Sequence, residues 1–328
     1  MDRLEIVCPA GTPAALRTAV AAGADSVYVG FRNETNARNF PGLNFDYEEL
    51  VAGIAFAHDH GVKVLLAINT YPRAGDPGPW QQAVDDAARA GADAVILADP
   101  GLLAYAQRTH PDLRRHLSVQ ASASNATAIA WYRRRFGIRR VVLPRVLTLP
   151  QIAAIARAVD VETEVFVFGG LCVMAEGRCL LSSYVTGESP NMNGVCSPAS
   201  AVRYHEEGDT LVSTLGGLTI NRFGPREKAG YPTLCKGRFV ARGEAAYLFE
   251  EPTSLNAVGM LPDLAAAGVR AIKIEGRQRG RAYIARVIGA VRAAVDAVAA
   301  GEPPDMTALH ALSEGGRETV GVYRKGWR

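Results

Sequence analysis

The sequence has no apolar run long enough to cross a membrane. A membrane-spanning helix needs about 18–20 consecutive apolar residues, and no stretch of the 328 residues approaches that length. The N-terminus, MDRLEIVCPAG, mixes acidic and basic residues and continues directly into an apolar run. It lacks the basic start and apolar stretch of a signal peptide. We therefore expect a cytoplasmic protein with no membrane span.

The chain also has little excess of positive over negative charge. Charged residues make up 21% of the chain and hydrophobic residues 48%, and the formal net charge is +3. These values are typical of a globular chain with a large core. A nucleic-acid-binding domain needs its basic residues on one face, and the cluster Arg133–Arg135 with Arg139 and Arg140 ends a predicted helix, where a solvated face is the more common role. The sequence does not favour nucleic acid as a partner.

Several common motifs are missing. No GxGxxG follows the first apolar run, which weakens the case for a dinucleotide-binding fold. No HExxH and no GxSxG occur, which argues against two large classes of peptidase. The tight CxxC pairs of zinc ribbons are absent as well.

Short apolar runs alternate with helical segments through most of the chain. The runs are continuous, as parallel strands buried on both faces require. The expected strands are Leu4–Cys8, Ser26–Gly30, Val62–Asn69, Ala94–Asp99, Leu117–Ala121, Arg140–Leu143, Glu164–Phe168 and Ala271–Ile274. The expected helices are Pro13–Ala22, Phe45–His60, Trp80–Ala90, Gly101–Thr109, Ala123–Phe136, Pro150–Val159, Leu261–Ala267 and Ala282–Ala299.

This order of elements predicts an α/β fold, a (β/α)8 TIM-like barrel. Glycines recur where a helix passes into the next strand, at 22–25, 90–93 and 267–269, and glycine suits the left-handed end of a helix. Residues 1–169 and 254–300 would form the barrel, 170–253 a cysteine-bearing insertion after the seventh strand, and 301–328 a C-terminal appendage. An open, doubly wound sheet is the alternative.

Four of the five cysteines are expected to form one metal site. Cys172, Cys179, Cys196 and Cys235 are separated by six, sixteen and thirty-eight residues. Thiols in the cytoplasm stay reduced, so such a group more often binds metal than forms disulfides. Four thiolates suit zinc or an iron–sulfur cluster, and spacing alone leaves both open, beside the possibility of four unrelated buried thiols. Cys8 is expected to be a core or pocket thiol.

In a barrel of this type the chemistry lies at the carboxyl ends of the strands. The polar residues expected there are Asn36, Arg38, Asn69, Asp99, Gln120, Ser122, Arg145, Glu275 and Arg277. The three arginines are candidates for binding a carboxylate through paired hydrogen bonds, and Glu275 for pairing with one of them or moving a proton. An internal ion-pair network that holds loops is the alternative interpretation.

The stretch EVFVFGGLCVMAEGRCLLS, residues 164–182, resembles the signature of the collagenase-like peptidase family U-32. The matching positions are Glu164, Phe166, Gly169, Cys172, Gly177, Cys179 and Ser182. Gly170 departs from the serine or alanine usual in the family. Many members also carry two close cysteines further on, whereas CSPASAVR has only Cys196, and Cys235 in YPTLCKGR takes the place of the other.

That departure resembles the UbiU branch of the family, as do ETNARNFPGLNF, SVQASASN and SSYVTGESPN. The resemblance implies a [4Fe–4S] cluster held by Cys172, Cys179, Cys196 and Cys235, and a heterodimer with a UbiV-like protein. It also implies oxygen-independent hydroxylation of a ubiquinone precursor during ubiquinone biosynthesis, with prephenate as a candidate oxygen donor. The alternatives are an RNA-base hydroxylase, a collagenase-like peptidase, and a scaffold that completes its partner's active site.

Overall fold

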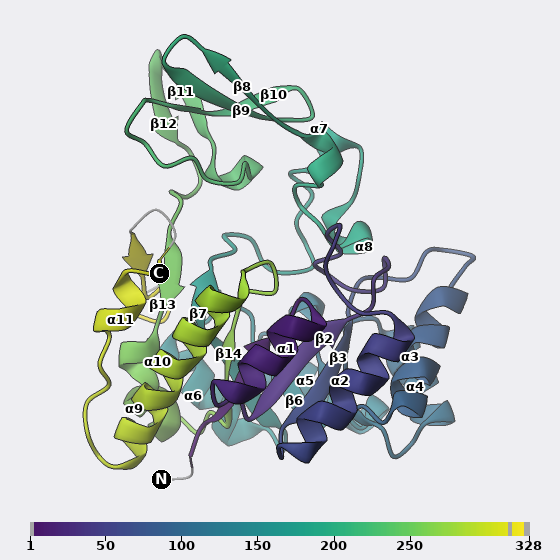
Figure 1. Cartoon of the computed structure of the whole chain (residues 1–328). Coiled ribbons are helices and arrows are strands. Elements are labelled where there is room, and N and C mark those ends of the chain that lie inside the picture. Colours follow the sequence, from purple (N-terminus) through teal and green to yellow (C-terminus); the bar gives the residue numbers. More distant parts are fainter. Residues whose placement is uncertain (1–2, 314–316, 325–328) are drawn as a thin grey trace.

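Eight parallel strands close into a barrel in this computed structural model, which describes residues 3–313 and 317–324 (Figure 1). The barrel strands are β1 Glu5–Pro9, β2 Ser26–Gly30, β3 Lys63–Ile68, β4 Ala94–Leu97, β5 Arg114–Leu117, β6 Arg140–Val142, β7 Glu162–Gly170 and β14 Ala271–Ile274. Each pairs in parallel with its neighbour, and pairing of β14 with both β7 and β1 closes the ring. The predicted TIM-like barrel is confirmed.

Helices surround the barrel and protect the outer face of its sheet (Figure 1). They are α1 Pro13–Ala21, α2 Tyr47–Asp59, α3 Gly78–Ala90, α4 Pro100–Thr109, α5 Ala126–Phe136, α6 Leu149–Ala158, α9 Leu261–Ala266 and α10 Arg281–Ala299. Gly23, Gly91 and Gly268 end three of them with φ values of 98°, 80° and 88°. The glycines are therefore needed for the left-handed turn into the next strand, as the repeated junctions predict.

One predicted strand is displaced. The run Leu117–Ala121 was expected as the fifth strand, but β5 covers Arg114–Leu117, and Val119–Ala121 forms a short 3-10 helix, η1. From the sequence, the charged residues Arg114, Arg115 and His116 indicate a surface loop. In the structure His116 is buried in the barrel, near the amino ends of the strands. The strand was therefore predicted three residues too late in the chain, because charged residues are unexpected in a barrel strand.

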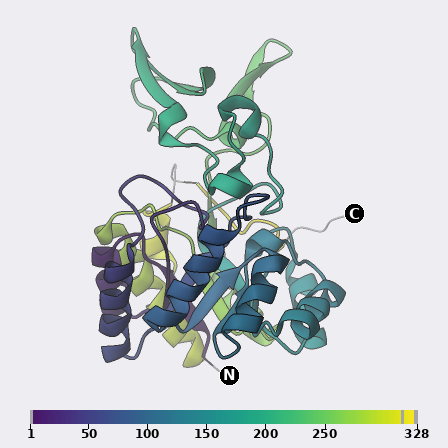
Figure 2. The ribbon, with the colours of Figure 1, turned by 90° about the vertical axis from the view of Figure 1, so that its right-hand side faces the viewer.

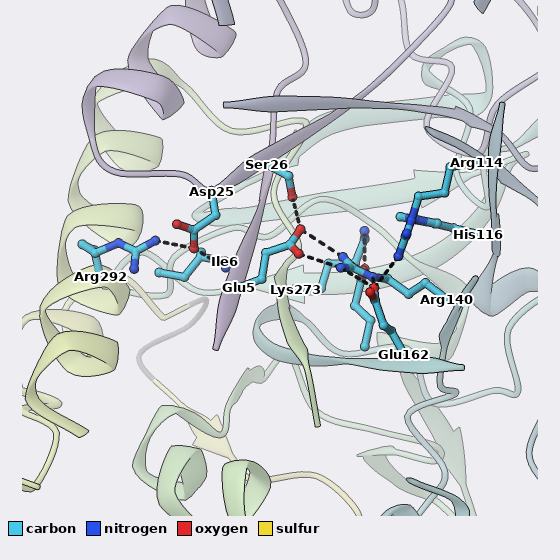
Figure 3. Close-up of polar contacts among 11 residues, drawn as sticks. Glu5, Ile6, Asp25, Ser26, Arg114, His116, Arg140, Glu162, Lys273 and Arg292 are labelled. Atoms are coloured by element: carbon cyan, nitrogen blue, oxygen red, sulfur yellow. Dashed lines mark hydrogen bonds and ion pairs between the residues drawn. The ribbon is translucent and has the colours of Figure 1, made fainter. Parts of the chain in front are cut away.

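The amino ends of the strands form the lower end of the barrel in Figure 1, and paired charges fill this end, as Figure 3 shows. Arg140 donates to both carboxylate oxygens of Glu5, at 3.0 and 2.6 Å, and to Glu162 at 2.8 Å. It also reaches Glu164, at 3.2 Å, which accepts from Lys273 at 2.7 Å. Each of these buried or half-buried ions thus has an opposite charge beside it, which offsets the cost of removing it from water.

Residues 171–253 stand above the carboxyl ends of the barrel strands (Figures 1 and 2). This segment contains the short helices α7 Ser183–Thr186 and α8 Pro190–Asn193, a three-stranded sheet and a two-stranded sheet. Its strands are β8 Val202–Glu207, β9 Thr210–Leu215, β10 Leu218–Phe223, β11 Arg238–Ala241 and β12 Glu244–Tyr247. The division of the chain into separate folding units stays a prediction.

Two short strands extend the barrel sheet beside β7. β13, Ser254–Asn256, pairs antiparallel with β7, and β15, Glu318–Thr319, pairs with β13. A one-turn helix, α11 Thr307–His310, precedes β15. None of the described helices is long and apolar enough to cross a membrane.

Candidate functional site

A cavity of about 160 Å³ lies at the carboxyl ends of the strands, beneath the cysteine-bearing segment. Its apolar walls include Tyr28 on β2, Ile96 on β4 and Phe166 on β7, and all four cysteines of the predicted site also line it. An adjoining cavity of about 510 Å³ shares Cys172, Cys196, Cys235, Arg38, Arg145, Thr233 and Glu275 with the first. These seven residues therefore face both spaces.

Two glycines let the cysteine-bearing segment press against the barrel loops. Gly177 has a φ of 75°, and a Cβ atom there would lie 2.0 Å from the carbonyl oxygen of Gln120. Gly194 has a φ of 80°, and its Cβ would lie 2.4 Å from the carbonyl oxygen of Asn36. Cys179 and Cys196, each two residues after one of these glycines, are thereby brought to the mouth of the barrel.

The four thiols act on one another electrostatically. Burial raises the pKa of the Cys235 thiol to about 12, and negative charge on Cys196, Cys172 and Cys179 contributes to the same shift. Burial also raises the pKa of Cys172, while the positive charge of Arg145 acts against it. Among the described residues, no three His, Cys, Asp or Glu side chains are arranged to hold a single metal ion. The thiols share a cavity without converging on one point.

Two linked ion pairs border the thiols, one of them buried, between Arg145 and Glu176, and one partly exposed, between Arg38 and Glu275. Arg38 donates from Nε and Nη2 to Glu275 Oε1, at 3.2 and 3.1 Å, and the other carboxylate oxygen accepts from the Gly170 amide at 2.8 Å. Arg145 donates to the Gly170 carbonyl and to Glu176, both at 2.7 Å. Gly170 therefore connects the two pairs.

The contact with Glu275 gives a physical reason for glycine at position 170. A Cβ on Gly170 would lie 2.5 Å from Glu275 Oε2, so any side chain there would displace the carboxylate from its amide. Burial raises the pKa of the Glu275 carboxyl, but Arg38, Arg145 and the Gly170 amide outweigh it and hold that pKa below its usual value. Glu275 is thus a carboxylate that accepts, rather than an acid that donates.

Six of the nine polar residues named from the sequence line the inner cavity: Arg38, Asn69, Gln120, Arg145, Glu275 and Arg277. Asp99 has a different place, because its side chain accepts from the Leu102 amide at 2.8 Å and caps α4. Ser122 ends η1 in a left-handed conformation. The catalytic roles of the six stay predictions.

Each arginine of the predicted carboxylate clamp already has internal partners. Arg38 and Arg145 bind the acids described above, and Arg277 donates to the Asn36 side chain at 3.1 Å and to the Ala37 carbonyl. Burial lowers the pKa of Arg277 to about 10. The alternative of an internal network that holds loops therefore describes these contacts well.

Sequence reasoning missed two charged residues of the cavity. Glu176 lies between Cys172 and Cys179 and forms the buried pair with Arg145, side chains 4% and 6% exposed. Lys273 interrupts the apolar strand AIKI and lies 3.9 Å from the centre of the Tyr28 ring. A lysine in the middle of a buried strand is the signal that was available for the second.

The C-terminal tail also reaches the cavity wall. The buried hydroxyl of Tyr323 donates to the carbonyl of Phe166 at 2.5 Å, and the Leu149 amide at the start of α6 donates to the Tyr323 carbonyl at 3.0 Å. The Arg145 guanidinium lies over the Phe166 ring, 4.2 Å from its centre. Residues predicted as a peripheral appendage thus support a wall of the cavity.

Comparison with known proteins identifies the family. Residues 11–321 match the model of peptidase family U32. The chain belongs to that family. It is 34% identical over 331 residues to the tRNA hydroxylation protein P of Escherichia coli, which covers 95% of this chain and 72% of that protein. The 23S rRNA 5-hydroxycytidine C2501 synthase of the same organism is 30% identical over 90% of this chain and 40% of its own length.

Another relative has the name of a peptidase. A protein named collagenase from Porphyromonas gingivalis is 30% identical over 90% of this chain and 66% of its own length. The family prediction from residues 164–182 is thereby confirmed. Its UbiU branch stays a prediction.

Proposed function

We propose that this chain is the iron–sulfur subunit of an oxygen-independent hydroxylase that acts on the aromatic ring of a ubiquinone precursor. The observation that carries the proposal is a ring-sized cavity beside four thiols. A cavity of about 150 Å³ is large enough to hold benzene, and the inner cavity measures about 160 Å³. Val119, Val142 and Phe166 among its walls suit an aromatic ring.

The donor set suits a [4Fe–4S] cluster better than zinc. A zinc ion would need four sulfur atoms about 2.3 Å from one point, and no described group converges in that way. In a cubane each cysteine binds a different iron atom, so its sulfur atoms lie further apart around a shared space. Cys172, Cys196 and Cys235 line both cavities and Cys179 lines the inner one, so a cluster would lie where the two cavities adjoin and the apolar walls of the inner one would be left to the ring.

Unpartnered polar atoms near the thiols support the same cluster. Within the described residues, the hydroxyls of Ser182 and Ser197 are buried without a hydrogen-bond partner. Ser182 lines the inner cavity and Ser197 the outer one. Hydroxyl donors beside a cluster are able to hydrogen-bond its sulfur atoms, so a bound cluster would satisfy them.

When bound, a [4Fe–4S] cluster supplies one-electron transfer. The residues of this chain would hold the cluster, surround the ring with apolar side chains and keep the carboxylates of Glu275 and Glu176 paired. Hydroxylation without O2 replaces a ring C–H by C–OH. With a hydroxylated organic donor such as prephenate, the ring takes the donor's OH and the donor takes the ring's H, so atoms and electrons balance.

A UbiV-like partner is part of the proposal. Apolar side chains are exposed on residues 171–253, including Tyr184 at 86%, Val240 at 75% and Phe249 at 55%. Contiguous exposed apolar patches mark protein–protein contacts, and these side chains are candidates for such a contact. Together with the resemblance, they support a heterodimer in which this segment meets the partner.

The test is a deletion strain grown without oxygen and analysed by mass spectrometry for quinones and for RNA nucleosides. We expect unhydroxylated quinone precursors to accumulate, and the wild-type gene and a Cys8→Ala variant to restore ubiquinone where Cys172→Ala does not. Normal quinone with a missing hydroxylated nucleotide would overturn the ubiquinone assignment.

An RNA-base hydroxylase is the second candidate. The names of two relatives favour it, and a base turned out of its stack also presents a single ring. A peptidase has less support, because the described residues that line the two cavities include no histidine to activate a serine or cysteine. The peptidase hypothesis would gain support if cluster-loaded protein cleaved peptides robustly and the Glu275→Gln variant did not.

A further inference from the structure

Arg38 has the most unusual backbone conformation in the cavity. Its φ is 110°, in the region that favours glycine, although it carries a long side chain. Contacts on both sides hold it there: its amide donates to the Gly194 carbonyl at 3.0 Å, and its carbonyl accepts from the side chain of Asn44 and the amide of Phe40, each at 3.0 Å. Strain of this kind persists where the surroundings over-determine it, and it gathers at functional sites.

The strained conformation carries the Arg38 guanidinium to the thiols. Arg38 lines both cavities together with Cys172 and Cys196. Burial lowers the pKa of its guanidinium, but negative charge on Glu275, Cys196 and Cys172 outweighs burial and raises that pKa above its ordinary value. Arg277, by contrast, lies over the Tyr28 ring and donates to Asn36. Arg38 is thus a cation that pairs with Glu275 and lines both cavities beside two of the four cysteines.

We propose that Arg38 sets the reduction potential of the cluster, and that its strained backbone is the means by which the loop holds the guanidinium beside Cys172 and Cys196. The inference rests on the proposed cluster but not on the identity of the substrate. Reduction adds one negative charge, and a partly buried cation nearby favours the more negative state. Removing Arg38 also leaves the Glu275 carboxylate with one counter-charge fewer, which disfavours reduction further.

The experiment is a redox titration of anaerobically reconstituted full-length protein, followed by EPR. At a fixed solution potential we expect Arg38→Gln and Arg38→Gly to lower the ratio of reduced to oxidised cluster about tenfold, equivalent to about 59 mV for a one-electron couple. Arg38→Lys keeps the charge and should stay near the wild-type ratio. Arg32→Gln is the matched control, because Arg32 lies early in the same loop but pairs with Glu49 at the surface.

A second measurement separates charge from strain. Arg38→Gln and Arg38→Gly lose the same ion pair, but glycine tolerates the φ of 110°. The iron-free Arg38→Gly protein should therefore melt at a higher temperature than iron-free Arg38→Gln, although both lower the potential. If Arg38 had only a structural role, the two variants would differ in stability but the reduction potential of the cluster would not change.

Each outcome is decisive. An intact cluster with an unchanged ratio in both neutral variants would overturn this inference alone, as would an Arg38→Gly protein no more stable than Arg38→Gln. A wild-type protein that binds no cluster would overturn the proposed function and this inference together. If the neutral variants lose the cluster, retention in Arg38→Lys supports the role of the charge, and loss in Arg38→Lys as well contradicts it.

Discussion

Both ends of the barrel contain charged side chains in ion pairs, but the surroundings of these pairs differ. At the lower end Arg140 is 4% exposed and its side chain is surrounded by the carboxylates of Glu5, Glu162 and Glu164. At the upper end Arg38 and Arg145 pair with Glu275 and Glu176 along one side only. Their other side faces two cavities, four thiols and unpartnered hydroxyls.

This difference separates a network that stabilises from one that binds. Each described ion of the lower network has an opposite charge beside it, so removing one ion leaves its partners uncompensated. Within the described part of the chain, the nearby His116 Nδ1 and Thr163 Oγ1 are buried without a hydrogen-bond partner, but no cavity with thiols adjoins them. The upper network holds buried polar groups without partners and a backbone conformation that disfavours folding. Such features persist where a ligand completes the site, and the four cysteines identify the kind of ligand.

Removing one cysteine should give the largest effect and test the upper end directly. Cys172→Ala takes away one iron ligand, and we expect iron and acid-labile sulfide to fall to background after anaerobic reconstitution. Cys8→Ala is the matched control, because Cys8 is fully buried in β1 and apart from both cavities. Equal iron contents in the two variants would contradict the claim that the upper end of the barrel binds the cluster.

Removing the central cation of the lower network should cost stability and leave metal binding unchanged. Arg140→Met leaves three carboxylates without their shared partner, and we expect a loss of about 3–5 kcal/mol in the free energy of unfolding by urea. Arg114→Met, at a more exposed site that also pairs with Glu162, should cost less than about 1 kcal/mol. A loss of iron in correctly folded Arg140→Met protein would contradict the separation of roles.

The lower network should also give the protein an acid-sensitive component of stability. Burial raises the pKa of Glu5, but Arg140 outweighs it and leaves that pKa lowered, and Glu162 shows the same balance with Arg114 and Arg140. Carboxyls with a lowered pKa in the folded state stabilise it above their unfolded value of about 4.3, and lose that contribution as the pH falls below it. Unfolding measured between about pH 6 and pH 3 should therefore show a shallower decline in Arg140→Met than in wild type; parallel curves would refute this.

The smallest expected effect concerns the hydroxyls of Ser182 and Ser197. If they hydrogen-bond sulfur atoms of the cluster, Ser182→Ala and Ser197→Ala should each shift the reduction potential to a slightly more negative value. Ser213→Ala is the control, since its hydroxyl on β9 is equally buried and unpartnered within the described residues but lines neither cavity. The same shift in all three variants would assign the effect to general changes in packing.

The sequence predicted the barrel well because its signals are local. Continuous apolar runs marked seven of the eight strands, and glycines such as Gly23 and Gly91 marked helix ends through their positive φ. The fifth strand was misplaced, because Arg114 and His116 are polar residues within a strand: Arg114 pairs with Glu162 on β7 and donates to His116 on its own strand. β13 was missed because three residues give too short a pattern.

The candidate site was predicted in its parts but not in its connections. Polar residues after successive strands, such as Asn69 and Gln120, meet at one end of any such barrel, so their shared cavity followed from the fold. The pairing of Arg145 with Glu176, and of Tyr323 with the wall at Phe166, depends on long loops folding back. No local pattern encodes such contacts.

The most direct test of the central claim is the metal content of the wild-type protein purified without oxygen. Iron and sulfide are measured together with the absorption spectrum and the EPR spectrum after reduction. We expect a brown protein with about four iron and four sulfide per chain and the EPR signal of a reduced [4Fe–4S] cluster. A colourless protein with one zinc ion and no iron or sulfide would contradict it.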